Sequence, residues 1–252
     1  MLRALPFAIA LLLIAFARST QAAPPLPEVA VTTCGQIVPP KTLGYLTGDL
    51  DCTGFTGRPP NVGQYEYGAA VYLDRKAKLD LRGFTLTGGY NGVLCNALTC
   101  DPKGRPCSRN ACEVFGGTLL ANGNTSRGVG GYEPVVHDVT ITGFSNGVYA
   151  YRKARVTRAT ISDSPMFGVA GKSLVVTDCT ITNNGSFGVS QNNTVGNLRL
   201  TGSTVTGNGT NPYCGLNPCA DVYAARPPRV TDTVCDTSMA YPSGNWNICA
   251  LD

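Results

Sequence analysis

The chain has 252 residues, of which 14% are charged, with a formal net charge of +4. This length suits one domain or one elongated repeat array. The charge is close to balance and no Lys/Arg run is dense, so a nucleic-acid partner is not expected.

Residues 1–23 are predicted to be a secretory signal peptide. A short basic start at Arg3 is followed by an apolar run over residues 4–17 and then by small residues. This order is typical of a signal peptide that is removed on export. Removal would take Arg3 and Arg18 with it, lowering the net charge from +4 to +2. No later apolar run has the length of about 18 residues that a membrane span needs, and we predict a secreted or periplasmic protein.

The remaining residues, 24–252, are predicted to form a single domain that is rich in cysteine. Eleven cysteines in an exported chain indicate disulfides in an oxidising compartment. Zinc is the alternative, but the spacings are wider than paired C-x2-C units and the chain has one His. We therefore predict disulfides and no metal. Ten of the cysteines form four close groups: Cys34 with Cys52; Cys95, Cys100, Cys107 and Cys112; Cys214 with Cys219; Cys235 with Cys249.

A repeat organises the chain from residue 84 onward. Its copies align on five apolar centres at intervals of 55, 20, 20 and 24 residues: Leu86, Ile141, Ile161, Ile181 and Val205. A period near 20 predicts a solenoid. The long first interval predicts one extra turn together with an insertion at about residues 94–135.

Each centre is flanked by Thr or Ser on both sides, which gives the alternation of a strand with one buried face. A Gly-Val pair follows most centres, and a third apolar element precedes the next one. Three short strands per turn are therefore predicted, in an all-β chain. The inward column two residues before each centre contains Cys179, which we predict to be an unpaired, buried thiol.

The repeated lines "VVHDVTITGFSNGVYAY", "VVTDCTITNNGSFGVSQNN" and "LRLTGSTVTGNGT" resemble the rungs of secreted right-handed parallel β-helix proteins of the pectate-lyase-like superfamily. The opening "CGQIVPPKTLGYLTGDLDCTG" and the ending "GNWNICALD" are similar to the entry and the closing edge of such proteins. The resemblance implies a right-handed parallel β-helix and, for an enzyme, a polysaccharide lyase, hydrolase or epimerase. A left-handed hexapeptide helix is the rival fold, but its strict six-residue spacing is not seen.

The ends and the insertion depart from the repeat. Cys34 with Cys52 and Cys235 with Cys249 are expected to staple the capping rungs. The insertion carries Arg105 and Arg109 and is basic, which makes it a candidate ligand site. A loop that only covers one flank of the solenoid is the alternative.

Candidate chemistry gathers around the only His of the chain. The catalytic motifs of polygalacturonase-like hydrolases and the acid clusters of calcium-dependent lyases are absent from the sequence. A charged column on three successive rungs consists of Asp138, Arg158 and Asp178. It is predicted either as a surface ion-pair ladder or as a site in which Arg158 is a base or a carboxylate clamp. The candidate catalytic residues are His137 and Arg158, and the candidate substrate-binding residues are Tyr149, Tyr151, Arg152, Lys153, Arg105 and Arg109.

These patterns favour an exported β-helix protein that engages extracellular or cell-surface glycans by binding. A polysaccharide lyase, hydrolase or epimerase is the first alternative, and a non-catalytic structural component of the cell envelope is the second. No cofactor and no membrane span are predicted, and the oligomeric state is left open.

Overall fold

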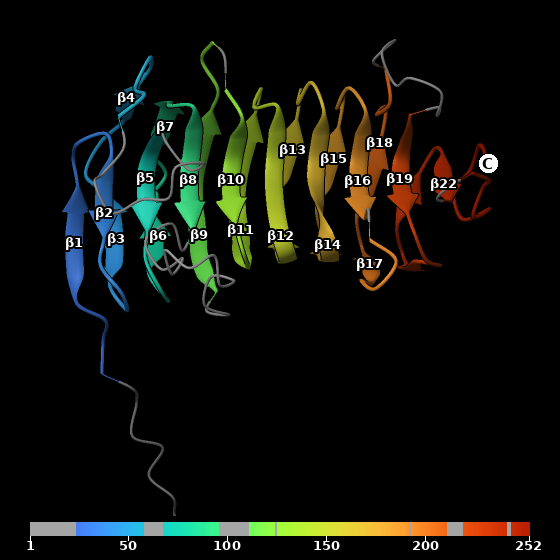
Figure 1. The fold of residues 1–252 in the computed structure, drawn as a ribbon, viewed down its shortest axis with the longest axis horizontal. Helices are drawn as coiled ribbons and strands as arrows, with labels where there is room; N and C mark the ends of the chain where they lie inside the picture. The colour runs from blue at the N-terminus through green and yellow to red at the C-terminus, as the bar shows by residue number, and fades with distance from the viewer. Residues whose placement is uncertain are drawn as a thin grey trace, which may run out of the picture.

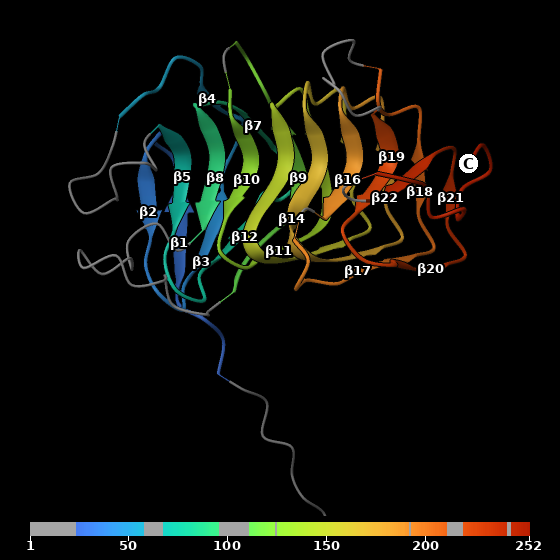
Figure 2. The ribbon, with the colours of Figure 1, turned by 45° about the vertical axis from the view of Figure 1, so that its right-hand side comes forward.

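The computed structural model describes residues 24–57, 68–95, 111–123, 125–191, 193–210, 219–240 and 243–252. The predicted signal peptide and several candidate positions lie outside the described residues: Cys100, Cys107, Cys214, Arg105 and Arg109. The described residues form 22 strands, which pair in parallel in one nearly closed solenoid-like sheet. Figures 1 and 2 show the rungs stacked along the long axis of the molecule.

The strands form three faces, which we call A, B and C, because each turn of the chain contributes a strand to each face. Face A consists of β2 (Gln36–Val38), β5 (Ala69–Leu73), β8 (Asn91–Cys95), β10 (Arg127–Gly131), the first halves of β12 (Asn146–Thr157) and β14 (Phe167–Thr177), β16 (Phe187–Gln191), β19 (Ala220–Ala224) and β22 (Ser238–Ala240). Face B consists of β1 (Glu28–Val31), β3 (Leu43–Leu46), β6 (Lys78–Asp80), the first halves of β9 (Cys112–Leu120) and β11 (Pro134–Thr142), the second halves of β12 and β14, β17 (Leu198–Thr201) and β20 (Arg229–Thr231). Face C consists of β4 (Leu50–Cys52), β7 (Thr85–Gly88), the second halves of β9 and β11, β13 (Thr160–Ser162), β15 (Thr180–Thr182), β18 (Thr204–Thr206) and β21 (Val234–Cys235).

The register on face C confirms the predicted alignment of the repeat. The centres Ile141, Ile161 and Ile181 pair rung to rung, and Val205 continues their column. Leu119 of β9 pairs with both Leu86 and Ile141 and so supplies the extra turn expected in the long interval.

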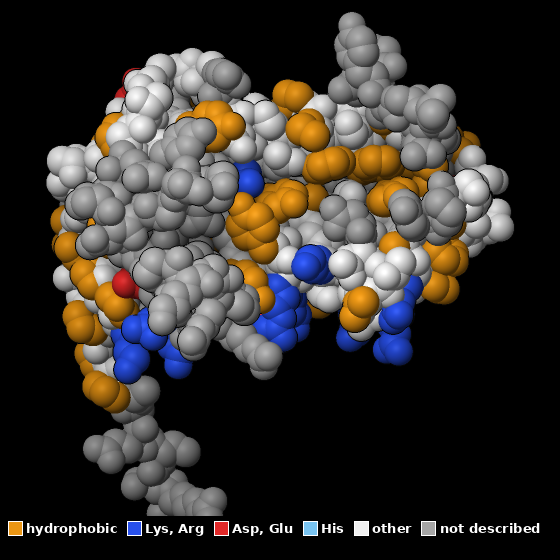
Figure 3. Space-filling model, in the orientation of Figure 1, with side chains coloured by type: hydrophobic (Ala, Val, Ile, Leu, Met, Phe, Trp, Pro, Cys, Tyr) orange, Lys and Arg blue, Asp and Glu red, His pale blue; other side chains and the backbone are white. Residues whose placement is uncertain are grey.

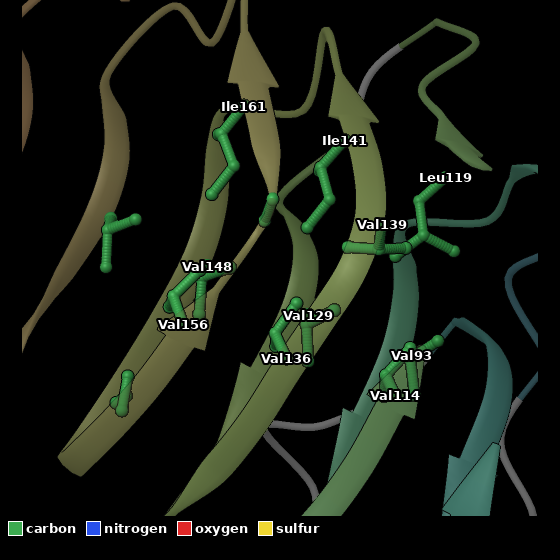
Figure 4. Packing of buried hydrophobic residues seen from close by; sticks show 14 of the residues in the cluster. Val93, Val114, Leu119, Val129, Val136, Val139, Ile141, Val148, Val156 and Ile161 are labelled. Carbon is green, nitrogen blue, oxygen red and sulfur yellow. The ribbon is translucent and has the colours of Figure 1, made fainter. Parts of the chain in front are cut away.

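The core is a column of apolar side chains from all three faces. Figure 4 shows Val129 and Val148 of face A, Val136 and Val156 of face B, and Ile161 of face C projecting into the same interior. Each of these side chains is 0% exposed. Burial of one such side chain contributes about 1.5–3 kcal/mol, so every rung adds to the stability of its neighbours.

The corner between faces B and C has a left-handed backbone in successive rungs of the solenoid. Asp138, Arg158 and Asp178 have φ angles of 53°, 47° and 52°. Asp adopts this region readily, whereas a long side chain such as Arg is strained there by about 1–2 kcal/mol. The corner therefore explains why short polar residues recur in this column, and it places three charged side chains in one row.

Three disulfides are described, which indicates an oxidising environment. Cys34–Cys52 and Cys235–Cys249 close the two ends as predicted, and Cys95–Cys112 closes the insertion. Cys219 is also disulfide-bonded. The prediction for Cys179 is confirmed, because it is the free cysteine of the described residues and is buried in the core.

Candidate functional site

A β-bulge in β12 marks the first departure from the regular repeat. Ala150 pairs with Gly171 and Lys153 with Ser173, so Tyr151 and Arg152 stand opposite a single residue of β14. A bulge re-aims the side chains beside it and is frequent next to binding sites. Here it lies where face A bends into face B.

The second departure is the loop of residues 193–197, which belongs to the 24-residue interval of the repeat. Gln191, fully buried, anchors it: its Nε2 donates to the carbonyl oxygen of Asn193 in the loop and to that of Lys172 at 3.0 Å, and its Oε1 accepts from the Ala225 amide at 3.0 Å. A Cβ atom on Gly196 would overlap the carbonyl oxygen of Lys172. The loop can therefore lie on β14 only because residue 196 has no side chain.

The bulge and the loop bound two adjoining hollows, which we call the tyrosine groove. The larger has a volume of about 520 Å³ and the other of about 400 Å³. They share four lining residues, and the groove as a whole is lined mainly by aromatic, cationic and amide side chains: Tyr132, Tyr149, Tyr151, Arg152, Lys172 and Asn193. Figure 3 shows Lys and Arg side chains gathered along the lower part of this face, beneath hydrophobic ones.

Aromatic and cationic groups are interleaved in the tyrosine groove. The rings of Tyr149 and Tyr151 meet edge to face with centroids 5.4 Å apart. The Arg127 guanidinium lies 4.9 Å and 5.2 Å from the two ring centroids. Such contacts hold flat aromatic surfaces in place, while the phenol groups supply polar ends. Arg152 is held by Glu133 and so has a fixed position at the groove.

A third hollow continues from the tyrosine groove across face B, sharing Ser173 with it. We call it the arginine groove; its volume is about 340 Å³, and its polar lining residues are Lys153, Ser173, Asn197, Arg199 and Arg229. No Asp or Glu is among the described lining residues. This groove has a positive surface that nothing in its own lining neutralises.

His137 lies elsewhere on face B, in a cluster in which every charge is paired. Its Nε2 is 2.8 Å from Glu113 Oε1 and its Nδ1 is 2.7 Å from Asp138 Oδ2. Glu113 also accepts from Lys78 at 2.7 Å. The imidazole stacks on the ring of Phe115 with a centroid distance of 4.9 Å. We call Lys78, Glu113, His137, Asp138 and Arg158 the paired cluster.

The paired cluster favours the protonated form of the imidazole. Partial burial opposes the charge, but hydrogen bonds to Glu113 and Asp138 raise the pKa of His137 above 6.5. The bonds donated by Arg158 and His137 hold the pKa of Asp138 far below its ordinary value. Both ring nitrogens are engaged by carboxylates, so neither is free to accept a proton from a substrate.

Arg158 is also held on one side. Its Nε and Nη2 donate to the two carboxylate oxygens of Asp138, each at 2.7 Å. Asp178, on the next rung, acts on Arg158 through space, raising the guanidinium pKa less than Asp138 does. Of the ion-pair ladder that the sequence offered as one alternative, the described residues form the pair of Arg158 with Asp138, and Asp178 acts on Arg158 through space only.

The predicted site residues fall into two separate places. Tyr149, Tyr151 and Arg152 line the tyrosine groove, and Lys153 lines the arginine groove. The candidate catalytic residues, His137 and Arg158, line none of these three hollows. Sequence reasoning did not find the further lining residues Tyr132, Lys172, Asn193, Arg199 and Arg229; the four extra residues in the last repeat interval were the available signal.

Comparison of the chain with protein-family models, with curated proteins and with solved structures finds no match in any of the three. In the part of the chain that the structure describes, no cluster of three or more His, Cys, Asp or Glu is arranged to hold a metal ion. No described segment is a helix with the length and apolar character of a membrane span.

Proposed function

We propose that the chain is an exported right-handed parallel β-helix protein that binds extracellular or cell-surface glycans along the tyrosine groove. The observation that carries the proposal is the open hollow of about 520 Å³ in which Tyr149 and Tyr151 stand beside Arg152 and Lys172. Aromatic faces with a few fixed polar groups are the usual composition of a ligand site. Sugars offer both an apolar ring face and hydroxyl groups, which such a lining complements.

Several observations support the architectural part of the proposal. The rungs repeat about every 20 residues and pair in parallel, as in the pectate-lyase-like proteins that the sequence resembles. The disulfides and the predicted signal peptide support export. The groove is formed by the bulge and the loop, which interrupt an otherwise regular scaffold, and solenoid proteins commonly bind ligands on such surfaces.

Binding is favoured over catalysis because the proton-transfer candidates are already occupied. His137 bridges two carboxylates, and Arg158 is held by Asp138. A general base needs a free acceptor within hydrogen-bond reach of the substrate. A purely structural envelope role, in turn, gives no reason for a groove that interrupts the repeat.

Calorimetric titration with a panel of neutral and acidic oligosaccharides tests the proposal. The double variant Tyr149→Ala/Tyr151→Ala should weaken binding at least about tenfold, because it removes both aromatic faces. Tyr45→Ala is the matched control, since Tyr45 also stacks with an arginine, Arg82 at 3.6 Å, on face B outside the groove. Its affinity should equal that of the unmodified protein.

Three outcomes would count against the proposal. No binding to any member of the panel would remove glycan recognition, and unchanged affinity in the double tyrosine variant would move it away from this groove. Release of reducing or unsaturated ends from the same oligosaccharides would show that the protein is an enzyme.

A further inference from the structure

An arginine column runs along face B in the second half of the solenoid. Arg155, Arg199 and Arg229 share one register position, with Val175 between the first two. All three arginines are exposed. Because neighbouring strands are about 4.8 Å apart, Arg199 and Arg229 stand about one strand spacing apart and Arg155 about two spacings from Arg199.

The protein does not neutralise this column. Like charges directly opposite one another on adjacent strands destabilise a sheet. The described residues provide no ion-pair partner for Arg155, Arg199 or Arg229. Asp178 and Asp232 follow the strands at the corner with face C and do not line the groove. An arrangement that costs free energy in the unbound protein is explained if an anion completes it.

Nearer the start of the solenoid, the same register column contains a cation that is neutralised by an acid on the adjacent strand. Lys78 and Glu113 occupy this register position on adjacent strands and form an ion pair of 2.7 Å. The position therefore accepts an acid without difficulty. The arginine groove differs from this earlier part of face B because, among the described residues, no acid occupies the column beside Arg199 and Arg229.

The remaining lining groups suit oxyanions that accept several hydrogen bonds. Lys153 adds a third cation, and Ser173 and Asn197 add side chains that can donate. Arginine presents a planar fork of N–H groups that matches phosphate-like oxygens in pairs. The floor is formed by strands β14 and β17, so the donors lie on regular elements rather than on the loop alone.

We propose that the arginine groove binds tetrahedral oxyanions, sulfate or phosphate esters, carried by a glycan chain that runs along the solenoid axis. The inference rests on the proposed function, because the tyrosine groove adjoins the arginine groove at Ser173 and would hold another part of the same chain. It adds the class of glycan and a second contact surface. The strand spacing places Arg155, Arg199 and Arg229 in one row along the axis, with separations of about two strand spacings and one.

The test compares four forms of one polymer: dextran, carboxymethyl dextran, dextran sulfate and phosphorylated dextran, the charged forms at equal charge density and in about 0.15 M salt. We expect the sulfated form, the phosphorylated form or both to bind at least about tenfold more tightly than the carboxymethyl form, because only the tetrahedral esters offer three acceptor oxygens per group. Which of the two binds more tightly identifies the source of the oxyanion. Equal binding of the carboxymethyl form would overturn the inference.

Variants of the arginine column locate the effect. Arg199→Gln/Arg229→Gln should weaken binding of the preferred ester about 10- to 100-fold. Arg199→Lys/Arg229→Lys keeps the charge but loses the planar fork, so it should lose most of the preference for esters over carboxylates. Full preference in the lysine variant would overturn recognition by arginine geometry. Arg75→Gln, an exposed arginine outside the groove, is the control and should change affinity less than about twofold.

Two further readouts separate this inference from the proposed function. If the oligosaccharide panel binds through Tyr149 and Tyr151 but esters add nothing, the inference fails and the proposed function stands. If ester binding depends on Arg199 and Arg229 while the tyrosine variant binds normally, the oxyanion site stands and the tyrosine groove fails. Inorganic polyphosphate that binds as tightly as the best dextran ester would overturn the glycan part of the inference.

Discussion

The paired cluster and the arginine groove lie on the same face of one solenoid but treat charge in opposite ways. In the paired cluster, Glu113 joins Lys78 to His137, and Asp138 joins His137 to Arg158. In the arginine groove, Arg199 and Arg229 share a column with no acid in their lining. The strands of both regions share one register column, in which Lys78 faces Glu113 whereas Arg199 faces Arg229.

This difference indicates that some charged side chains of the solenoid stabilise the fold and that others are available to a ligand. The side chains of the paired cluster form ion pairs with one another near the corner between faces B and C, so few of their hydrogen-bonding groups are free to contact a ligand. Charges without partners cost stability in the free protein and gain it back on binding. Single substitutions in each region test whether the two regions differ in this way.

The largest effect on stability is expected for Glu113→Ala. Glu113 is half-buried and accepts hydrogen bonds from both Lys78 and His137, so its loss leaves the partly buried imidazole ring with one partner fewer. We expect a loss of about 1–2 kcal/mol in the free energy of unfolding, measured by urea denaturation. Arg199→Ala, from the arginine groove, should stay within about 0.5 kcal/mol of the unmodified protein.

Lys78→Ala provides the matched control within the paired cluster. It removes one ion pair whose Lys78 side chain is 40% exposed and leaves Glu113 bonded to His137, so the expected loss is about 0.5 kcal/mol. If Glu113→Ala and Arg199→Ala proved equally stable, the contrast between the two regions would have no energetic basis.

Much of the fold follows from the sequence because local and long-range patterns agree. The Thr-Ile-Thr alternation around Ile161 and Ile181 specifies which side chains point inward, and a 20-residue period then fixes the register. Cys179 could be placed in the core by the same reasoning. Leu119 was not identified as a centre because Gly116 and Gly117 interrupt the apolar alternation before it.

The candidate site was less accessible to sequence reasoning because it depends on which rungs become neighbours. Arg199 and Arg229 are 30 residues apart in sequence, and they become neighbours in the sheet only because β17 pairs with β20. The bulge at Tyr151 and Arg152 shifts the pairing of β12 with β14 by one residue. The 20-residue spacing of the repeat centres does not reveal this extra residue. Likewise, proximity in sequence suggested that His137 faces Tyr151, whereas their strands pair on different faces.

A smaller, pH-dependent effect is expected at His137. Its folded pKa is raised above the model-compound value of 6.5, so its contribution to stability is fully present below that value and is lost as pH rises through the folded pKa. Asp138 behaves oppositely: its folded pKa is lowered from 3.8, so its contribution is present above that value and is lost as pH falls. The paired cluster should therefore stabilise the fold most between about pH 4.5 and 6.5.

Proton NMR can follow this titration without ambiguity, because the chain has one His. The ring resonances should titrate above pH 6.5, and Asp138→Asn should lower that midpoint by removing one carboxylate while keeping a residue that accepts the left-handed backbone. A midpoint at or below 6.5 in the unmodified protein would show that partial burial outweighs the two hydrogen bonds.

The smallest effect is expected for Asp178→Asn, and it decides between a pair and a ladder. Both hydrogen bonds of the Arg158 side chain go to Asp138, and Asp178 acts on it only through space. Between exposed groups such an interaction is largely screened by water and salt. Asn also tolerates the φ of 52° at this position, so the backbone should not be strained. The free energy of unfolding should change by less than about 0.5 kcal/mol, whereas Asp138→Asn should lower it clearly. Equal losses in the two variants would mean that Arg158 is shared evenly by its two acidic neighbours, as a ladder requires.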